Sequence, residues 1–323
     1  MRRPTPLRAH LPLLSAALLT GCLLACAPAP GAPAPSPDPR ERSTGAPLVV
    51  VATFSVLADV VAVIGGEDVL AGSITGPGMN VHGYEPTPED LRRAAAADLV
   101  VANGRGLETW LHDLVDPLGV PVAVVADAVE PLPVQGSAAE RGGSVHNPHV
   151  WMSPRTGQSY AAAVADALSS ADPAHAAGYR ARAAGLSAQL EDLATELDAA
   201  VATLPSDRRV LVTCEGAFSY LARDAGLREV YLWPVNAERQ GTPRQTARVI
   251  DTVREAQVPA VFCEWTVPAT AQQQVARETG ARYAGDLYVD ALSGPEGPAS
   301  TYLDLLRHDV ALIVSALTEE GDG

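Results

Sequence analysis

The sequence predicts an α/β protein of two lobes, each with a parallel sheet flanked by helices, joined by one long rigid helix. Three observations support this fold class. Residues 173–205 have the pattern of a single long helix, and short apolar runs alternate with amphipathic stretches on both sides of it. The length of 323 residues also suffices for two domains of about 120 to 150 residues each.

The connecting helix is the best marked element. Asp172 is a suitable N-cap, Pro173 fits the first helical turn, and Pro205 stops the run. Apolar residues recur at steps of three and four, which predicts one buried face formed by Leu186, Leu190, Leu193, Leu197, Val201 and Leu204. At about 1.5 Å per residue such a helix is roughly 48 Å long, enough to connect two lobes.

The other elements alternate along the chain. Continuous apolar runs predict buried parallel strands at residues 47–53, 98–103, 121–126, 209–213, 229–233 and 259–264. Amphipathic stretches predict helices at residues 56–64, 88–97, 106–114, 154–170, 218–225, 243–256, 268–279 and 301–317. The pattern predicts an N-terminal lobe at residues 47–172, the connecting helix at 173–205 and a C-terminal lobe at 206–319. Because parallel sheets bind ligands at the carboxyl ends of their strands, a site between the lobes is expected.

The N-terminus has the pattern of a bacterial lipoprotein signal peptide at residues 1–26. Arginines precede an apolar run at residues 11–24, which is short for a membrane span and typical of a secretory signal. Cys26 and Cys22 each end a segment that resembles the lipobox, in which a cysteine becomes the lipid-modified N-terminus. Cys26 is preferred, because the Pro/Ala-rich residues 27–46 that follow it are typical of an extended tether. Lipidation at Cys22, or cleavage without lipidation, are the alternatives.

Charge and cysteine content narrow the classes of partner. A net charge of −15 argues against nucleic-acid binding, which needs clustered positive side chains. The remaining cysteines, Cys214 and Cys263, are a pair that an exported protein can join in a disulfide. Each ends a short apolar run, so buried free thiols are at least as strongly indicated as a bridge.

Four side chains suited to metal binding lie in loops or at strand ends. His82 and His149 lie in loops that lead into predicted helices, Glu215 follows a predicted strand, and Asp290 follows an apolar segment. Two imidazoles and two carboxylates, one pair from each side of the connecting helix, predict a cage for a divalent cation. Glu264, at the end of a predicted strand, is either an acceptor for a ligand histidine or a buried structural carboxylate. Structural or solvated roles are expected for His112, His146, His175 and His308.

Several motifs in a fixed order resemble one known family. They are HGYEPTPEDLRRAAAADLVVANGRGLETWL, NPHVWMSP, CEGAFSYLARDAGL, WPVNAERQGTP and YVDALSGPEGPASTYLDLLRHDV. Through most of residues 48–318 the chain resembles the solute-binding lipoproteins that serve bacterial ABC importers of manganese, iron and zinc. The resemblance implies two α/β lobes joined by a long helix, with a metal held between them by His82, His149, Glu215 and Asp290.

The resemblance also bears on the choice of metal. Zinc carriers of this family tend to have a histidine where Glu215 stands, often with a His-rich loop, and this sequence has neither feature. Two carboxylates balance the charge of a divalent cation, and a larger share of oxygen ligands suits Mn²⁺ or Fe²⁺. Mn²⁺ is therefore expected, with Fe²⁺ and Zn²⁺ as alternatives. The chain departs from the family at Val81, Gly83 and Asn147, where Pro, Glu and Asp are common, and this concerns hydrogen bonds around the ligands.

The expected function is that of a metal receptor rather than an enzyme. The protein is expected to be a lipid-anchored monomer at the outer face of the cytoplasmic membrane, which delivers its ion to an ABC permease. One alternative is a metal-dependent hydrolase, because histidine and carboxylate ligands also build catalytic sites with an open position for water. A role as a surface adhesin is the other alternative.

Overall fold

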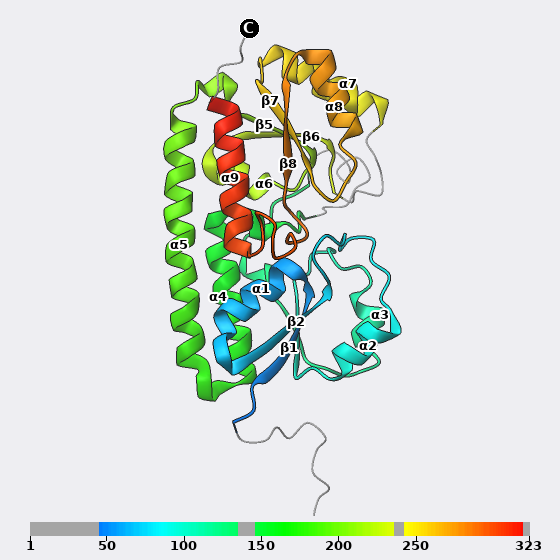
Figure 1. The fold of residues 1–323 in the computed structure, drawn as a ribbon, viewed down its shortest axis with the longest axis vertical. Helices are drawn as coiled ribbons and strands as arrows, with labels where there is room; N and C mark the ends of the chain where they lie inside the picture. Colours follow the sequence, from blue (N-terminus) through cyan, green and yellow to red (C-terminus); the bar gives the residue numbers. More distant parts are fainter. Residues whose placement is uncertain (1–44, 135–145, 236–241, 319–323) are drawn as a thin grey trace, which may run out of the picture. The chain divides into compact units, whose positions relative to one another are not determined.

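Parallel strands and helices alternate along the chain, as the sequence predicts (Figure 1). A computed structural model describes residues 45–134, 146–235 and 242–318, which all belong to one compact unit, Arg42–Gly323. The predicted signal peptide, Cys22, Cys26 and most of the tether lie outside the described residues. None of the helices in these ranges has the length and hydrophobicity that a membrane-spanning segment needs.

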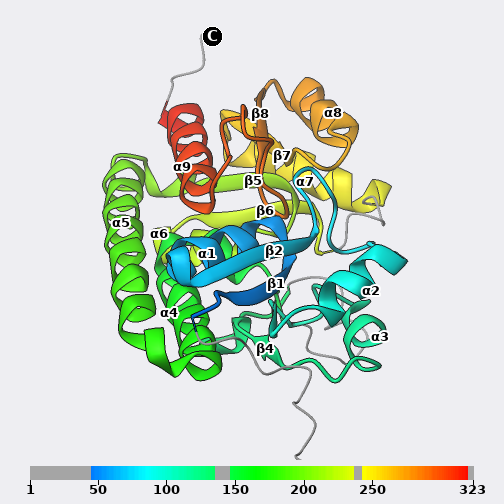
Figure 2. The same ribbon diagram turned by 60° about the horizontal axis from the view of Figure 1, so that its bottom comes forward.

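The N-terminal half contains a four-stranded parallel sheet in the order β2-β1-β3-β4 (Figure 2). Its strands are β1 (Leu48–Phe54), β2 (Val69–Thr75), β3 (Leu99–Ala102) and β4 (Val122–Val124). The helices of this half are α1 (Ser55–Gly65), α2 (Pro88–Ala95), α3 (Leu111–Val115) and α4 (Pro154–Ala171). β2 is absent from the predicted strands because this edge strand exposes central residues and so has no continuous apolar run. The helix predicted at residues 106–114 begins later, at Leu111, because Arg105 and Gly106 have positive φ angles, which a right-handed helix excludes.

Among its described residues, the C-terminal half contains two parallel strand pairs that are not hydrogen-bonded into one continuous sheet. The pairs are β5 (Val210–Glu215) with β6 (Arg228–Trp233), and β7 (Ala260–Glu264) with β8 (Arg282–Leu287). Two side chains bind the backbone of β5. The Gln272 amide donates to the Val212 carbonyl, and the carboxylate of Glu264, the last residue of β7, accepts from the Glu215 N–H. The flanking helices are α6 (Ser219–Ala225), α7 (Pro243–Glu255), α8 (Thr270–Thr279) and α9 (Tyr302–Thr318).

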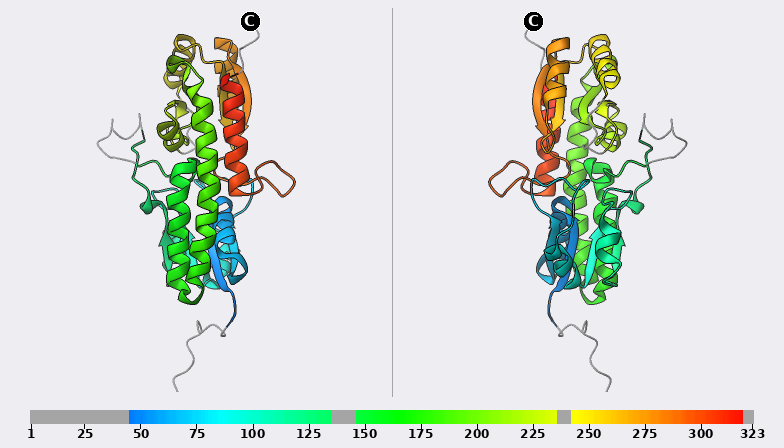
Figure 3. Two further views of the ribbon diagram at one scale, coloured as in Figure 1. Left: turned by 90° about the vertical axis from the view of Figure 1, so that its left-hand side faces the viewer. Right: turned by 90° about the vertical axis from the view of Figure 1, so that its right-hand side faces the viewer.

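The long connecting helix is present as α5 (Ala176–Ala202), which follows a 3₁₀ turn at Pro173–His175. It packs against α1 and α4 of the N-terminal half and against α6 and α9 of the C-terminal half (Figure 3). The six predicted apolar residues are all buried. Asp172 stands at the expected position before Pro173, but its carboxylate accepts from the Tyr179 hydroxyl at 2.8 Å instead of capping the backbone. The lobe boundaries at residues 172 and 206 stay a prediction.

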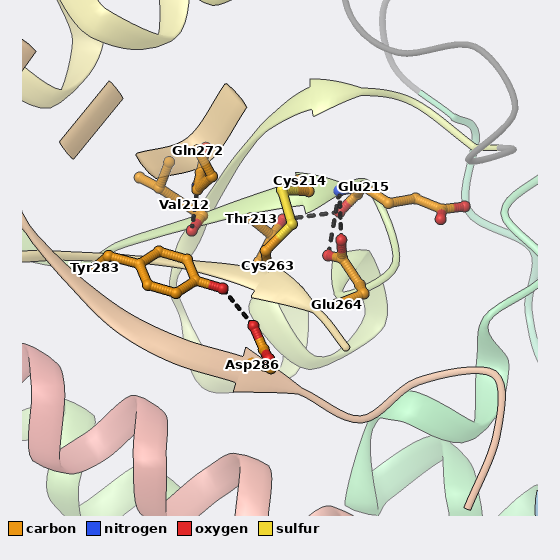
Figure 4. Close-up of a disulfide and its surroundings, with 9 residues drawn as sticks. All are labelled: Val212, Thr213, Cys214, Glu215, Cys263, Glu264, Gln272, Tyr283 and Asp286. Atoms are coloured by element: carbon orange, nitrogen blue, oxygen red, sulfur yellow. Dashed lines mark hydrogen bonds between the residues drawn. A yellow bond between two sulfur atoms is a disulfide. The ribbon is translucent and has the colours of Figure 1, made fainter. Parts of the chain in front are cut away.

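Cys214 and Cys263 form a disulfide, which corrects the expectation that buried free thiols were at least as strongly indicated (Figure 4). The two residues lie at equivalent positions near the ends of β5 and β7, with Cα atoms 4.8 Å apart. That separation is within the usual range of about 4.4–6.8 Å for a disulfide. The sequence alone does not show that these two strands are neighbours.

Candidate metal site

The four predicted ligands come from four loops or strand ends and meet in one buried place. His82 lies in the loop between β2 and α2, and His149 directly precedes a 3₁₀ turn, Val150–Met152. Glu215 is the last residue of β5, and Asp290 lies in the loop between β8 and α9. None of the four is more than 4% exposed.

The imidazole Nε2 atoms face the two carboxylates. His82 Nε2 lies 3.5 Å from Glu215 Oε1 and 3.6 Å from Asp290 Oδ2. His149 Nε2 lies 3.7 Å from the same Glu215 oxygen and 3.5 Å from Asp290 Oδ1. Each histidine thus faces a different oxygen of Asp290, so this carboxylate can offer both oxygens to a central ion.

These separations fit the size of a transition-metal ion. For any two donors that subtend the tetrahedral angle at an ion, the metal–ligand distance is the donor separation divided by about 1.63. Separations of 3.5 to 3.7 Å therefore correspond to metal–ligand distances of about 2.1–2.3 Å, slightly longer than the roughly 2.0–2.1 Å of zinc–imidazole bonds. The donors of His82, His149 and Glu215 also all lie within 4.8 Å of one another.

Donor atoms of His82, His149 and Asp290 are available to bind an ion. His82 Nε2, His149 Nε2 and Asp290 Oδ1 are buried and have no hydrogen-bond partner among the described residues. Burial acts to raise the pKa of Asp290, but the nearby imidazoles of His82 and His149 outweigh it and lower the pKa below its ordinary value. The site therefore buries a carboxylate oxygen and two imidazole nitrogens that have no partner among the described residues, and burying such polar atoms is costly unless a ligand binds them.

Glu264 supports Glu215 from behind. Both of its carboxylate oxygens lie 3.1 Å from the Glu215 backbone nitrogen, and Figure 4 shows the Glu215 side chain extending away from this contact. Burial raises the pKa of Glu264 well above its ordinary value, and the charge of Glu215 raises it further. Of the two predicted roles, the contact fits a buried structural carboxylate, since it accepts from the backbone of Glu215 and not from a histidine.

Contacts from several elements also hold the loop that carries Asp290. The Trp151 indole N–H donates to the Val289 carbonyl at 3.0 Å, and the Leu292 N–H donates to Ser55 Oγ at 3.0 Å. The Asp309 carboxylate accepts from the Tyr288 N–H at 2.9 Å. Residues from the N-terminal half therefore position a loop of the C-terminal half. The hydrogen bond from Trp151 to Val289 is not predictable from the sequence, because a tryptophan two residues after His149 has the pattern of an ordinary core residue.

The remaining described histidines have other surroundings. His112 is exposed and faces Asp116, His175 contacts Asp172, and the His308 ring packs on Tyr288. His146 is exposed and pairs with Pro133 in an isolated bridge. Among the described residues, the donors grouped around Glu215 are those of His82 and His149, and these other histidines lie outside the group.

Comparison with known proteins shows what this chain is similar to. The profile of the family described as "Zinc-uptake complex component A periplasmic" matches residues 50–316. The iron-binding protein YfeA of Yersinia pestis is 43% identical over 265 residues, which are 82% of this chain and 84% of YfeA. The manganese-binding lipoprotein MntA of Halalkalibacterium halodurans is 34% identical over 276 residues, which are 85% of this chain and 90% of MntA.

Solved structures agree with the sequence matches. The Mn-bound periplasmic metal binding protein of Candidatus Liberibacter asiaticus has a TM-score of 0.78 at 33% identity, covering 84% of this chain and 99% of that one. The periplasmic zinc binding protein TroA of Treponema pallidum has a TM-score of 0.76 at 25% identity. The predicted resemblance is confirmed, and the chain belongs to the zinc-uptake complex component A family of metal-binding proteins.

Proposed function

We propose that the protein is the extracytoplasmic receptor of an ABC importer, which captures a divalent transition-metal cation and delivers it to the permease. The observation that carries this proposal is the buried group of His82, His149, Glu215 and Asp290, whose facing donors are 3.5 to 3.7 Å apart. Neutral imidazoles with two carboxylates balance a divalent charge. Because the four residues are almost fully buried, release of the ion requires the loops that carry them to separate.

Mn²⁺ is the cation that we propose, ahead of Fe²⁺ and Zn²⁺. The described contacts offer two nitrogens, one oxygen of Glu215 and both oxygens of Asp290. Zn²⁺ commonly takes four ligands and bonds well to imidazole, whereas a set richer in oxygen suits a harder ion. The relatives YfeA and MntA are named for iron and manganese. Affinity alone still rises toward Zn²⁺ along the Irving–Williams order, so isolated protein is expected to bind Zn²⁺ as well.

Binding, not catalysis, is the proposed activity. A hydrolytic metal site needs an open coordination position and a nearby general base. Glu264 is the nearest further carboxylate that sequence analysis singled out, and it is bonded to the Glu215 backbone behind the site. The relatives reported above are named as binding proteins, which gives the hydrolase alternative no support.

The cellular setting is proposed from the N-terminal sequence and the relatives. We place the protein at the outer face of the cytoplasmic membrane as a monomer, anchored by lipid on Cys26, because MntA is named a lipoprotein and the solved relatives are named periplasmic. The Pro/Ala-rich residues 27–46 then act as the tether.

Metal titration of alanine variants tests the proposed site. We expect His82→Ala, His149→Ala, Glu215→Ala and Asp290→Ala each to weaken Mn²⁺ binding by at least about 100-fold, equivalent to about 2.7 kcal/mol. The matched control is His112→Ala, because this exposed histidine faces Asp116 and lies outside the donor group. Competition titration with a chelator of known affinity measures each constant. Wild-type affinity in any of the four variants would remove that residue from the cage.

A further inference from the structure

Asn147 is fully buried beside His149, and its side-chain amide bonds to both sides of the site. Its Oδ1 accepts from the His149 backbone N–H at 3.0 Å and lies 2.9 Å from Nδ1 of the same histidine. Its Nδ2 donates to the Gly216 carbonyl at 2.6 Å and to Ser219 Oγ at 3.0 Å. Gly216 directly follows Glu215. The Asn147 amide therefore contacts His149, a predicted ligand from the N-terminal half, and the residue next to Glu215, a predicted ligand from the C-terminal half.

The groups around this amide allow one orientation. A backbone N–H only donates and a carbonyl oxygen only accepts, so Oδ1 of Asn147 must face His149 and Nδ2 must face Gly216. Ser219 agrees with this, because its hydroxyl donates to Glu229 Oε2 at 2.5 Å and keeps its lone pairs for Nδ2. Nδ1 of His149 therefore faces an acceptor and carries the hydrogen of the neutral ring. The lone pair is then on Nε2, the atom that faces both carboxylates of the site.

The backbones of Gly216 and of Asn147 itself are held in place. A Cβ atom on Gly216 would lie 2.5 Å from the Pro234 carbonyl oxygen, so the backbone packs too closely there for a side chain. On the other side, the Asn147 carbonyl accepts from the Tyr220 hydroxyl at 2.9 Å, and the Asn147 N–H donates to the Leu132 carbonyl at 2.8 Å. The Asn147 amide thus connects two segments whose backbones are fixed.

We propose that Asn147 is a positioning residue that presents His149 to the cation through Nε2 and fastens this histidine to the turn after Glu215. The inference rests on the proposed function, because it assigns both histidine and glutamate to the metal site. Hydrogen bonds to the second nitrogen of a ligand histidine fix its tautomer and orientation, and their loss commonly weakens metal binding about 10- to 100-fold.

At position 147 an amide can both accept from Nδ1 of His149 and donate to the Gly216 carbonyl, whereas a carboxylate can only accept. An aspartate at position 147 keeps the acceptor for Nδ1 of His149. It has no hydrogen to give to the Gly216 carbonyl, so two oxygens would meet where the structure has a 2.6 Å hydrogen bond. This explains how Asn147, which stands where the family commonly has aspartate, suits the surroundings in this chain.

Ring-nitrogen NMR and metal titration test the proposal together. Protein labelled with ¹⁵N in its histidine rings is measured metal-free at mildly alkaline pH, and the His149 signals are assigned by their absence in His149→Ala. We expect wild type and Asn147→Asp to show a protonated Nδ1 and an unprotonated Nε2. Asn147→Ala is expected to show a mixture of tautomers and about 10- to 100-fold weaker Mn²⁺ binding. The control is Gln189→Ala, which removes an exposed amide bonded to Gly185 of its own helix and should leave both readouts unchanged.

Two results would overturn the inference: a protonated Nε2 on His149 in the wild type, or wild-type Mn²⁺ affinity in Asn147→Ala. If Asn147→Ala does not fold, the wild-type and Asn147→Asp spectra still decide, because loss of the Nδ1 proton in either contradicts the proposed contact. Failure of the wild type to bind Mn²⁺, Fe²⁺ and Zn²⁺ would instead overturn the proposed function. The tautomer of His149 would then still show whether Asn147 orients the ring.

Discussion

Removal of the disulfide between Cys214 and Cys263 should cost a large part of the stability of the metal-free protein. The two residues are 49 positions apart in the sequence, so the bridge closes a loop of that length in the unfolded chain. The chain-entropy relation for a loop of this size gives about 4 kcal/mol. Globular proteins unfold with free energies of about 5–15 kcal/mol, so a loss of this size is readily measured.

The perturbation is the double substitution Cys214→Ala and Cys263→Ala, which leaves no unpaired thiol. Urea unfolding followed by circular dichroism should show a lower free energy of unfolding, and thermal scans should show a melting temperature lower by about 7 °C. Unfolding the wild type in a thiol reductant is the matched control, since it breaks the same bond without a change of sequence. A double variant within about 1 kcal/mol of the wild type would show that the bridge does not stabilise the protein by constraining the unfolded chain.

Three further predictions concern the metal, a buried acid and the anchor. Glu215→His adds an imidazole and removes a carboxylate, so competition titration should show the ratio of Zn²⁺ to Mn²⁺ affinity rising at least about tenfold, or about 1.4 kcal/mol; an unchanged ratio would contradict direct coordination by this residue. Burial raises the pKa of Asp309 well above its ordinary value. Its ionisation therefore lowers the free energy of unfolding as pH rises from about 4 toward the folded-state pKa. In urea unfolding, Asp309→Asn should gain stability relative to wild type over that pH interval. A difference in stability that does not change with pH would contradict this. Cys26→Ser should release the protein from membranes on fractionation, and Cys22→Ser should not; retention of the Cys26 variant would assign the lipid to Cys22.

Strongly patterned elements could be predicted from the sequence. The apolar repeat of α5 and the buried runs of β1 and β5 depend on local spacing, and the structure confirms them. Edge strands β2 and β8 were missed because their residues are partly exposed, so no continuous apolar run marks them. Local pattern also does not show which strands become neighbours, which is why the disulfide was left open.

The ligand residues of the candidate site could be predicted from the sequence, but their supporting contacts could not. Histidines and carboxylates in loops beside predicted strands could be singled out from residue type and position, and the structure brings the four together. The contacts that orient them could not be predicted. The Asn147 amide reaches Gly216, 69 residues away, and the Trp151 indole reaches Val289, 138 residues away. Such contacts depend on how distant loops pack, which no spacing in the sequence encodes.

X-ray absorption spectroscopy of the Mn²⁺-loaded protein tests the proposed metal site, because it measures the ligands and their distances without assuming which residues bind. We predict a shell of nitrogen and oxygen donors at about 2.1–2.3 Å, with the outer-shell scattering of two imidazole rings and loss of one ring in His149→Ala. A shell of oxygen donors without imidazole scattering, or a spectrum unchanged by the His149→Ala substitution, would contradict metal binding by these histidines.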